Sequence, residues 1–308
     1  KGYDAAAYAH DFRVFHAFME KTDPPIKILG PGGVGESGSL GSIPGMKLVR
    51  TQDILSEEGP GLDAFSYHFY GGVSKRCAMM GAKATTSPEA ALSNEWLSRA
   101  LHDEEFYAKL RDQFVPGMPI WLTETGETAC GGDPWASDFI DSFRYLNQLG
   151  TLAKQGVQVI MHNTLDASDY ALLDETTLKP RPDYWSALLW RRLMGTTVLN
   201  AGSSTSPDLH LYAHCLRGRP GGVALLAINA QRQMPASISL PKSSQRYTLT
   251  SADLMSPAVM LNGTELQLNA EGDLPAINGA SQKSGIVQLS PASIAFFAIT
   301  DAKNKACR

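Results

Sequence analysis

The alternation of apolar and polar positions changes its period at about residue 195. Before that point, short apolar runs of strand length alternate with longer stretches in which apolar residues recur every three or four positions. The strand-like runs lie near residues 26, 64, 119 and 157, and the helical stretches are residues 3–19, 52–58, 85–114, 137–155 and 182–194. Strands that alternate with helices are typical of parallel βα units.

From about residue 195 the chain shows short strand-like runs separated by turn residues, with no helical stretch between them. These runs are residues 198–201, 209–215, 223–230, 236–240, 247–251, 259–261, 266–268, 286–289 and 294–299. Asn262-Gly263 between two of them is a signal of a tight β-hairpin. The pattern predicts α/β plus all-β architecture: the C-terminal half of a (β/α)8 barrel over residues 1–194, followed by a β-sandwich over residues 195–308.

Four βα units cannot close a barrel. The half barrel would leave two sheet edges open, and open edges pair with other strands. We therefore expect the remaining four strands on a segment that precedes residue 1 or on another chain. This expectation follows from the number of units alone.

Composition restricts the class of partner. The chain has 308 residues, with 43% hydrophobic and 19% charged residues, which is typical of a globular protein. Its net charge is −4 and it has no long run of Lys or Arg, which argues against a nucleic-acid or anionic-membrane partner. No apolar stretch reaches the roughly 18 residues of a membrane span. The first residues lack the apolar core of a secretory signal, so we expect the chain to begin within a domain or after processing.

One carboxylate, Glu124, is singled out by its position. Residues 120–122 are predicted to form a buried strand, the sequence turns polar at Thr123, and a Gly-rich turn follows at residues 129–132. In a parallel barrel, a charged residue at the carboxyl end of a strand lies at the catalytic face. Glutamates also end strands as capping or ion-pair residues, so the pattern leaves both roles open.

A second strand end carries candidate residues. His68 and Tyr70 alternate with Phe69 at the end of the aromatic run 62–70, so they share one face of a strand. A histidine on a strand is more often a structural residue than a catalytic one, and at the carboxyl end of a strand the two roles are about equally frequent. The glycines at residues 30–33 are expected to form a turn after strand 26–29, but without a Gly-Lys-Ser/Thr ending they are no phosphate loop.

Four cysteines are present: Cys77, Cys130, Cys215 and Cys307. None has the close C-x-x-C spacing of a metal site, which argues against zinc. In an oxidising compartment the four thiols allow three different pairings. The alternative is that some of them are buried free thiols.

Several stretches resemble a known family. They are LDAFSYHFY, IWLTETGETACGG, FRYLNQLGTLAKQGVQVIMHNTL, ASDYALLDETTLKPRPDYWSALLWRRLMGTTVL, LYAHC, VMLNGTELQL and the terminal Ala-Cys. From residue 62 to residue 307 the chain resembles the heparanase-like enzymes of glycoside hydrolase family 79, which are retaining β-glucuronidases and endo-glucuronidases. The bacterial members look most similar. The resemblance implies a (β/α)8 barrel with a β-sandwich packed on it.

The resemblance also implies roles for individual residues. Glu124, in a Trp-Leu-x-Glu-Thr context, matches the nucleophile of the family. Retaining hydrolysis needs this carboxylate about 5–5.5 Å from a protonated partner carboxyl, so that it can form a glycosyl ester that water then hydrolyses. His68 and Tyr70 match residues beside the nucleophile, where they would orient Glu124 and keep it ionised.

A carboxylate-binding site is implied further along the chain. Gly131 and Gly132 match a turn whose backbone N–H groups receive the carboxylate of a uronic acid, and small residues allow that close approach. Tyr170 matches a tyrosine whose hydroxyl meets the same carboxylate. From the residues alone, Tyr170 would be interpreted as a core aromatic residue.

The resemblance implies one disulfide, and the positions of the other two cysteines suggest a second. Cys215 and Cys307 match a disulfide of animal heparanase that ties the sandwich to its C-terminus. The family often has a tyrosine where this chain has Cys130. Because Cys77 lies in the loop after the preceding strand, we suggest a Cys77–Cys130 disulfide that stiffens the Gly turn. Disulfides would place the protein in an oxidising compartment, secreted or periplasmic.

The acid/base glutamate of the family lies in an Asn-Glu motif just ahead of the helix at residues 3–19, so we expect it upstream of residue 1. No residue of the chain replaces it. Glu127 is too near Glu124 on the same turn to face it across a sugar, and we expect it to be a loop residue. Glu36 follows the preceding Gly turn, and we expect it to be exposed to solvent.

The sequence therefore predicts a retaining glycosidase that cleaves β-linked glucuronic acid from a saccharide, with a further segment completing its barrel. No metal or organic cofactor is expected, because two carboxylates suffice. Only Lys75, Arg76 and Lys83 cluster near the expected face, which favours small or chain-end substrates over a long anionic polymer. The alternatives are a retaining xylosidase or arabinofuranosidase, and a non-catalytic carbohydrate-binding protein.

Overall fold

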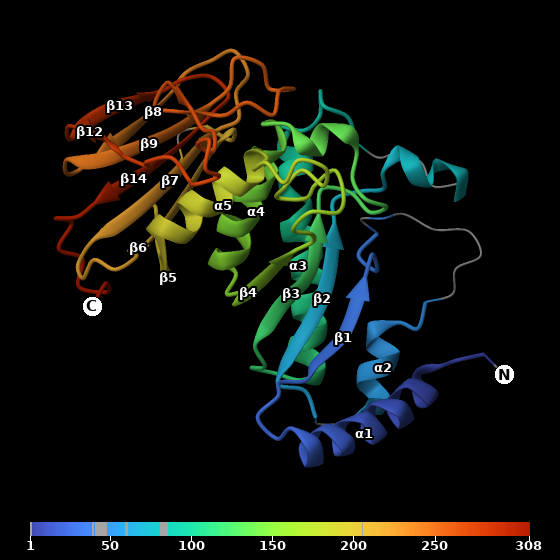
Figure 1. Cartoon of the computed structure of the whole chain (residues 1–308). Helices are drawn as coiled ribbons and strands as arrows, with labels where there is room; N and C mark the ends of the chain where they lie inside the picture. Colours follow the sequence, from blue (N-terminus) through green and yellow to red (C-terminus); the bar gives the residue numbers. More distant parts are fainter. Residues whose placement is uncertain (1, 39, 41–47, 59–60, 81–85, 205) are drawn as a thin grey trace. The chain divides into compact units, whose positions relative to one another are not determined.

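The computed structural model describes residues 2–38, 40, 48–58, 61–80, 86–204 and 206–308 (Figure 1). The chain forms two compact units whose segments interleave along the sequence. Unit 1 comprises Lys1–Thr85, Arg99–Cys130 and Gln155–Asn163, and unit 2 comprises Thr86–Ser98, Gly131–Lys154 and Thr164–Arg308. The division into residues 1–194 and 195–308 stays a prediction.

Unit 1 is built on a parallel sheet of four strands, as the alternation of strands and helices predicts. Their order across the sheet is β1 (Leu29–Val34), β2 (Ala64–Tyr70), β3 (Ile120–Gly126) and β4 (Val159–His162). The helical segments are α1 (Ala5–Thr22), α2 (Thr51–Glu58), the short η1 (Lys75–Met80) and most of α3 (Asn94–Phe114). Figure 1 shows the four strands side by side, in colours from blue to green.

The first strand differs from its prediction. We expected a strand at residues 26–29 and a turn at residues 30–33, but β1 begins at Leu29 and runs through the glycines. Among the described residues β1 pairs only with β2, and the register shifts between Pro31 and Gly33. A strand with one neighbour tolerates proline, because the missing N–H can lie on the unpaired side. A Cβ on Gly33 would overlap the Thr51 hydroxyl, so this part of the strand needs glycine.

The third helix also differs from its prediction. We expected it to begin near residue 85, in a stretch of which residues 81–85 lie outside the description. In the structure α3 begins at Asn94, and residues 88–92 form turns. Ser93 decides the start, because its hydroxyl accepts a hydrogen bond of 3.2 Å from the backbone N–H of Trp96, as an N-cap residue does.

Unit 2 contains two antiparallel sheets and the helical segments η2 (Pro134–Ser137), α4 (Asp141–Lys154) and α5 (Pro182–Leu193). The larger sheet has the order β11-β10-β9-β14-β7-β6-β5, with β12 also paired to β9, and the smaller sheet is β13-β8. The strands are β5 (Met194–Leu199), β6 (Leu209–Leu216), β7 (Val223–Asn229), β8 (Ala236–Leu240), β9 (Ser244–Thr250), β10 (Met260–Leu261), β11 (Thr264–Glu265), β12 (Ala280–Gln282), β13 (Gly285–Leu289) and β14 (Ser293–Ile299).

Most of these strands were predicted within a few residues, and the hairpin at Asn262-Gly263 is confirmed by the pairing of β10 with β11. The expected strand at residues 266–268 is wrong, because the second arm of that hairpin is β11, directly after the turn. The short β12 was missed, since three mostly exposed residues carry no alternating pattern.

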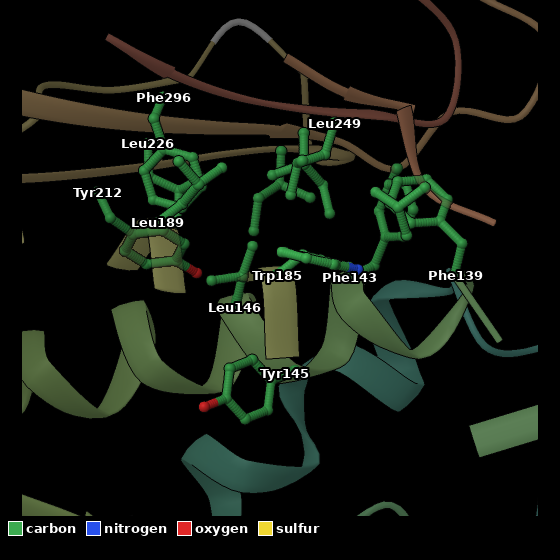
Figure 2. Packing of buried hydrophobic residues seen from close by; sticks show 14 of the residues in the cluster. Phe139, Phe143, Tyr145, Leu146, Trp185, Leu189, Tyr212, Leu226, Leu249 and Phe296 are labelled. Atoms are coloured by element: carbon green, nitrogen blue, oxygen red, sulfur yellow. The ribbon is translucent and has the colours of Figure 1, made fainter. Parts of the chain in front are cut away.

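The core of unit 2 lies on both faces of the larger sheet. Ile294 and Phe296 of β14 belong to the cluster that α4 and α5 cover, whereas Ala295 and Phe297 belong to the cluster beneath β8 and β13. Figure 2 shows the first cluster, in which Phe143 and Leu146 of α4 and Leu189 of α5 lie against side chains of the sheet. Because successive strand residues point to opposite faces, β14 is buried along its whole length.

Glu104 of α3 gives unit 1 a pH-dependent stability. Its side chain is 3% exposed, and burial raises its pKa from 4.5 to about 7, an effect that Arg111 opposes. This pKa lies above that of the unfolded chain, so stability falls as pH rises from about 4.5 to about 7. We expect Glu104→Gln to gain about 1 kcal/mol relative to wild type at pH 8 and nothing at pH 4. Thermal unfolding at both pH values measures this. The exposed Glu105→Gln is the matched control, and an equal gain at both pH values would contradict the assignment.

Candidate active site

Glu124 lies on β3 directly beside His68 of β2, with which it is paired in register. Tyr70 Oη donates a hydrogen bond of 2.6 Å to Glu124 Oε1, and His68 Nδ1 lies 3.6 Å from Glu124 Oε2. The Glu124 side chain is 40% exposed. The structure thus brings these three predicted residues together around a carboxylate that solvent, and hence a ligand, can reach.

His68 affects Glu124 more through its position beside the carboxylate than through a positive charge. Burial lowers the pKa of His68 below 6.5, and the neighbouring Glu124 carboxylate only partly opposes this shift. The imidazole is therefore mostly neutral at pH 7 and offers one N–H donor.

Asn163 is a site residue that the sequence analysis missed. Its Nδ2 donates a hydrogen bond of 2.9 Å to Tyr70 Oη, and its backbone N–H bonds to the Thr125 carbonyl at 2.8 Å. Since Tyr70 accepts a bond from Asn163, its single proton is directed to Glu124. The available signal was the polar run His162-Asn163-Thr164 after the predicted strand 157–161, at the same end of the sheet.

The hydrogen bonds from Asn163 to Tyr70 and from Tyr70 to Glu124 form a relay, which leads to a testable prediction. Tyr70→Phe removes one donor to the Glu124 carboxylate, and we expect kcat of any reaction that uses this carboxylate to fall by about 100-fold. Asn163→Asp is expected to lower kcat more than Asn163→Ala, because an aspartate would compete with Glu124 for the Tyr70 proton. Steady-state kinetics of the three variants measures both effects. An Asn163→Asp enzyme as active as wild type would disprove the relay.

The loops after β2 and β3 continue the pairing of these strands. Gly71 N–H bonds to the Glu127 carbonyl at 3.1 Å, and Ala129 N–H bonds to the Gly72 carbonyl at 2.9 Å. Beyond them, Cys77 and Cys130 form a disulfide with a Cα–Cα distance of 6.1 Å. The residue that precedes the Gly turn is therefore held covalently.

Neither of the other two glutamates considered faces Glu124 as a partner carboxyl. Glu127 is fully buried in the loop after β3, and its Oε2 accepts a bond of 2.6 Å from the Thr128 hydroxyl. Glu36 is not exposed to solvent as we expected. It is partly buried, and its carboxylate accepts hydrogen bonds from the backbone N–H and hydroxyl of Thr51. The reason is that the first N–H groups of α2 need acceptors.

In unit 2, the glycines of the predicted carboxylate-binding turn lie against Tyr170. Gly131 and Gly132 have φ values of 85° and 84°, which favour glycine. The Gly131 carbonyl accepts a bond of 2.9 Å from the Asp169 N–H, and a Cβ on Gly132 would lie 2.9 Å from Tyr170 Cδ1. Tyr170 is only 4% exposed, so a ligand can meet only a small part of it.

The other predicted cysteine pair is also a disulfide. Cys215 of β6 and Cys307 are joined with a Cα–Cα distance of 5.2 Å. This bond ties the last residues to the larger sheet of unit 2. The Asn304 N–H bonds to the Gly221 carbonyl at 2.9 Å and holds the same segment.

Further features of the described residues bear on partners. Lys75 and Arg76 are exposed on η1, and Lys83 lies outside the described residues. In the part of the chain that the structure describes, no three His, Cys, Asp or Glu side chains gather as metal ligands would. Its helices are too short or too polar to cross a membrane.

The combination of a parallel sheet and antiparallel sheets on one chain has matches among solved structures of glycosidases. The solved GH51 α-L-arabinofuranosidase of Thermotoga petrophila matches with a TM-score of 0.68 at 17% identity, over 96% of this chain and 62% of that one. At this identity the match shows a shared fold.

Sequence relatives specify the family, although no family model matches. Heparanase of Gallus gallus is 32% identical over 277 residues, which is 83% of this chain and 50% of the relative. Baicalin-β-D-glucuronidase of Scutellaria baicalensis is 36% identical over 184 residues (57% of this chain, 34% of the relative). Inactive heparanase-2 of Mus musculus is 30% identical over 225 residues (65% and 38%). The chain belongs to the heparanase-like family, glycoside hydrolase family 79, and spans half the length of the Gallus gallus heparanase.

Proposed function

We propose that the protein containing this chain is a retaining glycoside hydrolase that cleaves β-linked glucuronic acid, with Glu124 as its nucleophile. The observation that carries the proposal is the accessible Glu124 carboxylate, bound by Tyr70 and flanked by His68 at the carboxyl end of a parallel sheet. The names of the relatives, heparanase and baicalin-β-D-glucuronidase, support the substrate class.

The reaction has two steps. In the first, a Glu124 oxygen attacks the anomeric carbon, the bond to the leaving oxygen breaks, and an acid protonates that oxygen. In the second, water attacks the same carbon, its proton passes to the conjugate base of that acid, and Glu124 is released as a carboxylate. Tyr70 and Asn163 hold Glu124 in the direction of attack. In this proposal the acid/base residue is the glutamate of an Asn-Glu motif upstream of residue 1.

A further part of the proposal is that additional βα units complete the sheet of unit 1 as a (β/α)8 barrel. Among the described residues, the outer edges of β1 and β4 are unpaired. Helix α1 exposes Val14, Phe15 and Phe18, and β4 exposes Met161. Unpaired edges and exposed apolar side chains both favour contact with further elements. Residues 1–194 would be the C-terminal half of this barrel and residues 195–308 its sandwich.

We further propose that Gly131, Gly132 and Tyr170 bind the carboxylate of the sugar. Their mutual packing and the left-handed conformation of both glycines support a preformed turn. In the sequence, only Lys75, Arg76 and Lys83 cluster near the expected face, which favours small or chain-end glucuronides. Two disulfides favour a secreted or periplasmic location.

The test is covalent trapping. The full-length protein is incubated with a glucuronic-acid-configured 2-fluoro glycosyl fluoride, which leaves a stable glycosyl ester on a retaining nucleophile. We expect one adduct by intact mass, localised to the peptide that contains Glu124 and absent from Glu124→Gln. An adduct formed only with a xylose- or arabinose-configured probe would replace the uronidase with the alternative glycosidases.

A second candidate function is favoured by one finding, the similarity to inactive heparanase-2. If the protein binds the glucuronic-acid probe measurably and forms no adduct, the glycosidase proposal fails. A non-catalytic carbohydrate-binding protein would then remain.

A further inference from the structure

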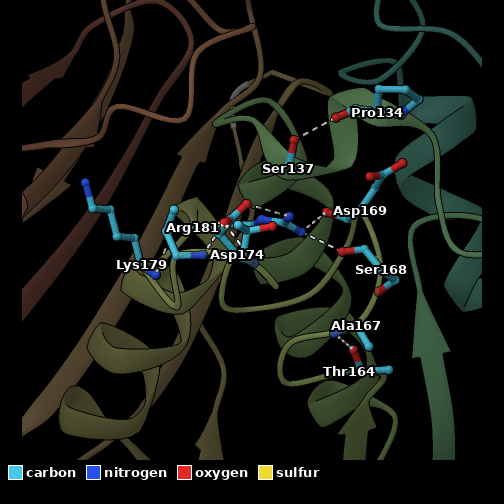
Figure 3. Close-up of polar contacts among 11 residues, drawn as sticks. Pro134, Ser137, Thr164, Ala167, Ser168, Asp169, Asp174, Lys179 and Arg181 are labelled. Carbon is cyan, nitrogen blue, oxygen red and sulfur yellow. Dashed lines mark hydrogen bonds and ion pairs between the residues drawn. The ribbon is translucent and has the colours of Figure 1, made fainter.

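Arg181 connects two neighbouring segments of unit 2: the hairpin at residues 174–179 and the loop at residues 164–173, which carries Tyr170. Its Nη1 donates hydrogen bonds to the carbonyl oxygens of Ser168 at 2.5 Å and Asp169 at 3.0 Å. Its Nη2 donates to Asp174 Oδ2 at 3.2 Å. Figure 3 shows this guanidinium between the loop and the hairpin. The side chain is 13% exposed, so most of it is buried against these groups.

Asp174 fixes the position of Arg181. Its Oδ1 accepts bonds of 2.8 Å from both the N–H and the hydroxyl of Thr177 and one of 3.2 Å from the Thr176 N–H, which closes the hairpin turn. The bonds from Thr177, with a smaller contribution from Arg181, lower the pKa of Asp174 to about 2. Asp174 is therefore an anion at every working pH, and its second oxygen remains available to the guanidinium.

The carbonyl groups that Arg181 holds are next to the predicted carboxylate-binding turn. The Asp169 N–H donates to the Gly131 carbonyl, the Asp169 carbonyl accepts from Arg181, and the Tyr170 ring occupies the space beside Gly132. At the other end of the loop, the Leu172 N–H bonds to the Thr164 carbonyl at 3.2 Å. A displacement of residues 168–169 would therefore displace Tyr170 and the turn together.

Arg181 also lines a cavity of about 800 Å³, together with Lys179, Trp185 and Asn269. If the guanidinium were removed, water from this cavity could hydrate the two carbonyl groups. The loss should therefore loosen the loop without unfolding unit 2.

We propose that Arg181, anchored by Asp174, is a positioning residue that holds the loop at residues 164–173 and thereby sets the affinity of the Gly131–Tyr170 site for an acidic sugar. The substrate part of this inference rests on the proposed function, whereas the holding of the loop does not. Arginine suits the role because the nitrogens of one planar group reach two carbonyls and a carboxylate, whereas the ammonium of lysine has all its donors on a single atom.

Two variants and a control test the inference in the full-length protein. Arg181→Met removes the donors, and Asp174→Asn keeps an oxygen for the hairpin turn but presents an amide N–H to Arg181. Lys179→Met is the matched control, because it removes a positive charge from the same hairpin and the same cavity wall. Arg181→Lys should recover part of the wild-type behaviour.

Hydrogen exchange and kinetics are measured together. We expect the Asp169 and Leu172 amides to exchange about 10-fold faster in Arg181→Met and Asp174→Asn, and at the wild-type rate in Lys179→Met. On an aryl β-glucuronide we expect KM to rise about 10-fold, with kcat changed less than about 3-fold, because the change weakens binding away from the reacting atoms.

Each outcome tests one part of the inference. Unchanged exchange in Arg181→Met overturns the positioning role. Faster exchange with an unchanged KM overturns the connection to the acidic sugar. If the wild-type protein does not hydrolyse glucuronides, the proposed function fails, and the exchange rates still decide whether Arg181 holds the loop.

Discussion

Glu124→Gln in the full-length protein is expected to lower kcat on an aryl β-glucuronide by about 10,000-fold or more, with a much smaller change in KM. The amide keeps the size of the side chain and can still contact Tyr70, but it cannot form the glycosyl ester. Its contact with substrate in the ground state should change little, so the loss falls on the chemical step. Steady-state kinetics and the trapping reaction measure this on the same preparation.

Azide distinguishes a nucleophile from any other essential carboxylate. In Glu124→Ala, azide can occupy the vacated space and attack the anomeric carbon from the same face. The leaving group departs and the α-glycosyl azide forms. Recovery of activity by azide with this product supports Glu124 as the nucleophile, and a β-configured product would assign it to the acid/base role instead. Glu36→Gln is the matched control, because Glu36 caps α2, and we expect it to retain activity.

Arg144→Met is expected to destabilise the protein by about 3–5 kcal/mol, the largest effect on stability that we predict. Arg144 and Asp141 are buried in α4, and the guanidinium binds both carboxylate oxygens of Asp141, at 2.7 and 2.6 Å. The same group lies 3.6 Å from Asp183 of α5, which is also buried. Removing the arginine leaves two buried acidic groups without a cation. Urea unfolding measures the loss, and the exposed Arg192→Met on α5 is the control, expected to cost less than about 0.5 kcal/mol.

The two aspartates should respond differently to replacement by asparagine. Burial and the neighbouring Asp141 raise the pKa of Asp183 well above its usual value, although Arg144 and a hydrogen bond from Ser142 oppose this. Asp183 is thus favoured in its protonated form, and Asp183→Asn should cost little. Since the pKa of Asp183 is higher in the folded chain than in the unfolded chain, wild type loses stability as pH rises above about 4. The free energy of unfolding of Asp183→Asn, relative to wild type, should therefore be more favourable at pH 7 than at pH 4. Asp141→Asn should destabilise the protein at both pH values. Equal losses for the two substitutions would contradict this assignment.

Local patterns predicted the elements more accurately than their ends. The four parallel strands and the hairpin at Asn262-Gly263 follow from periodicity and turn chemistry, which depend on near neighbours in the sequence. The start of β1 could not be predicted in this way, because the glycines of residues 30–33 indicate a turn when considered alone. Their pairing with a strand more than 30 residues away made them a strand.

The sequence by itself determined that βα units precede short antiparallel strands and that Glu124 ends a buried strand, since both follow from the order of apolar and polar residues. The tertiary structure alone decided which groups meet there. Asn163 lies 93 residues from Tyr70, and Arg181 is 12 residues from the Asp169 carbonyl that it binds. Glu36 caps a helix instead of facing solvent. Hydrogen bonds between residues far apart in sequence have no periodicity, so only the folded chain specifies them.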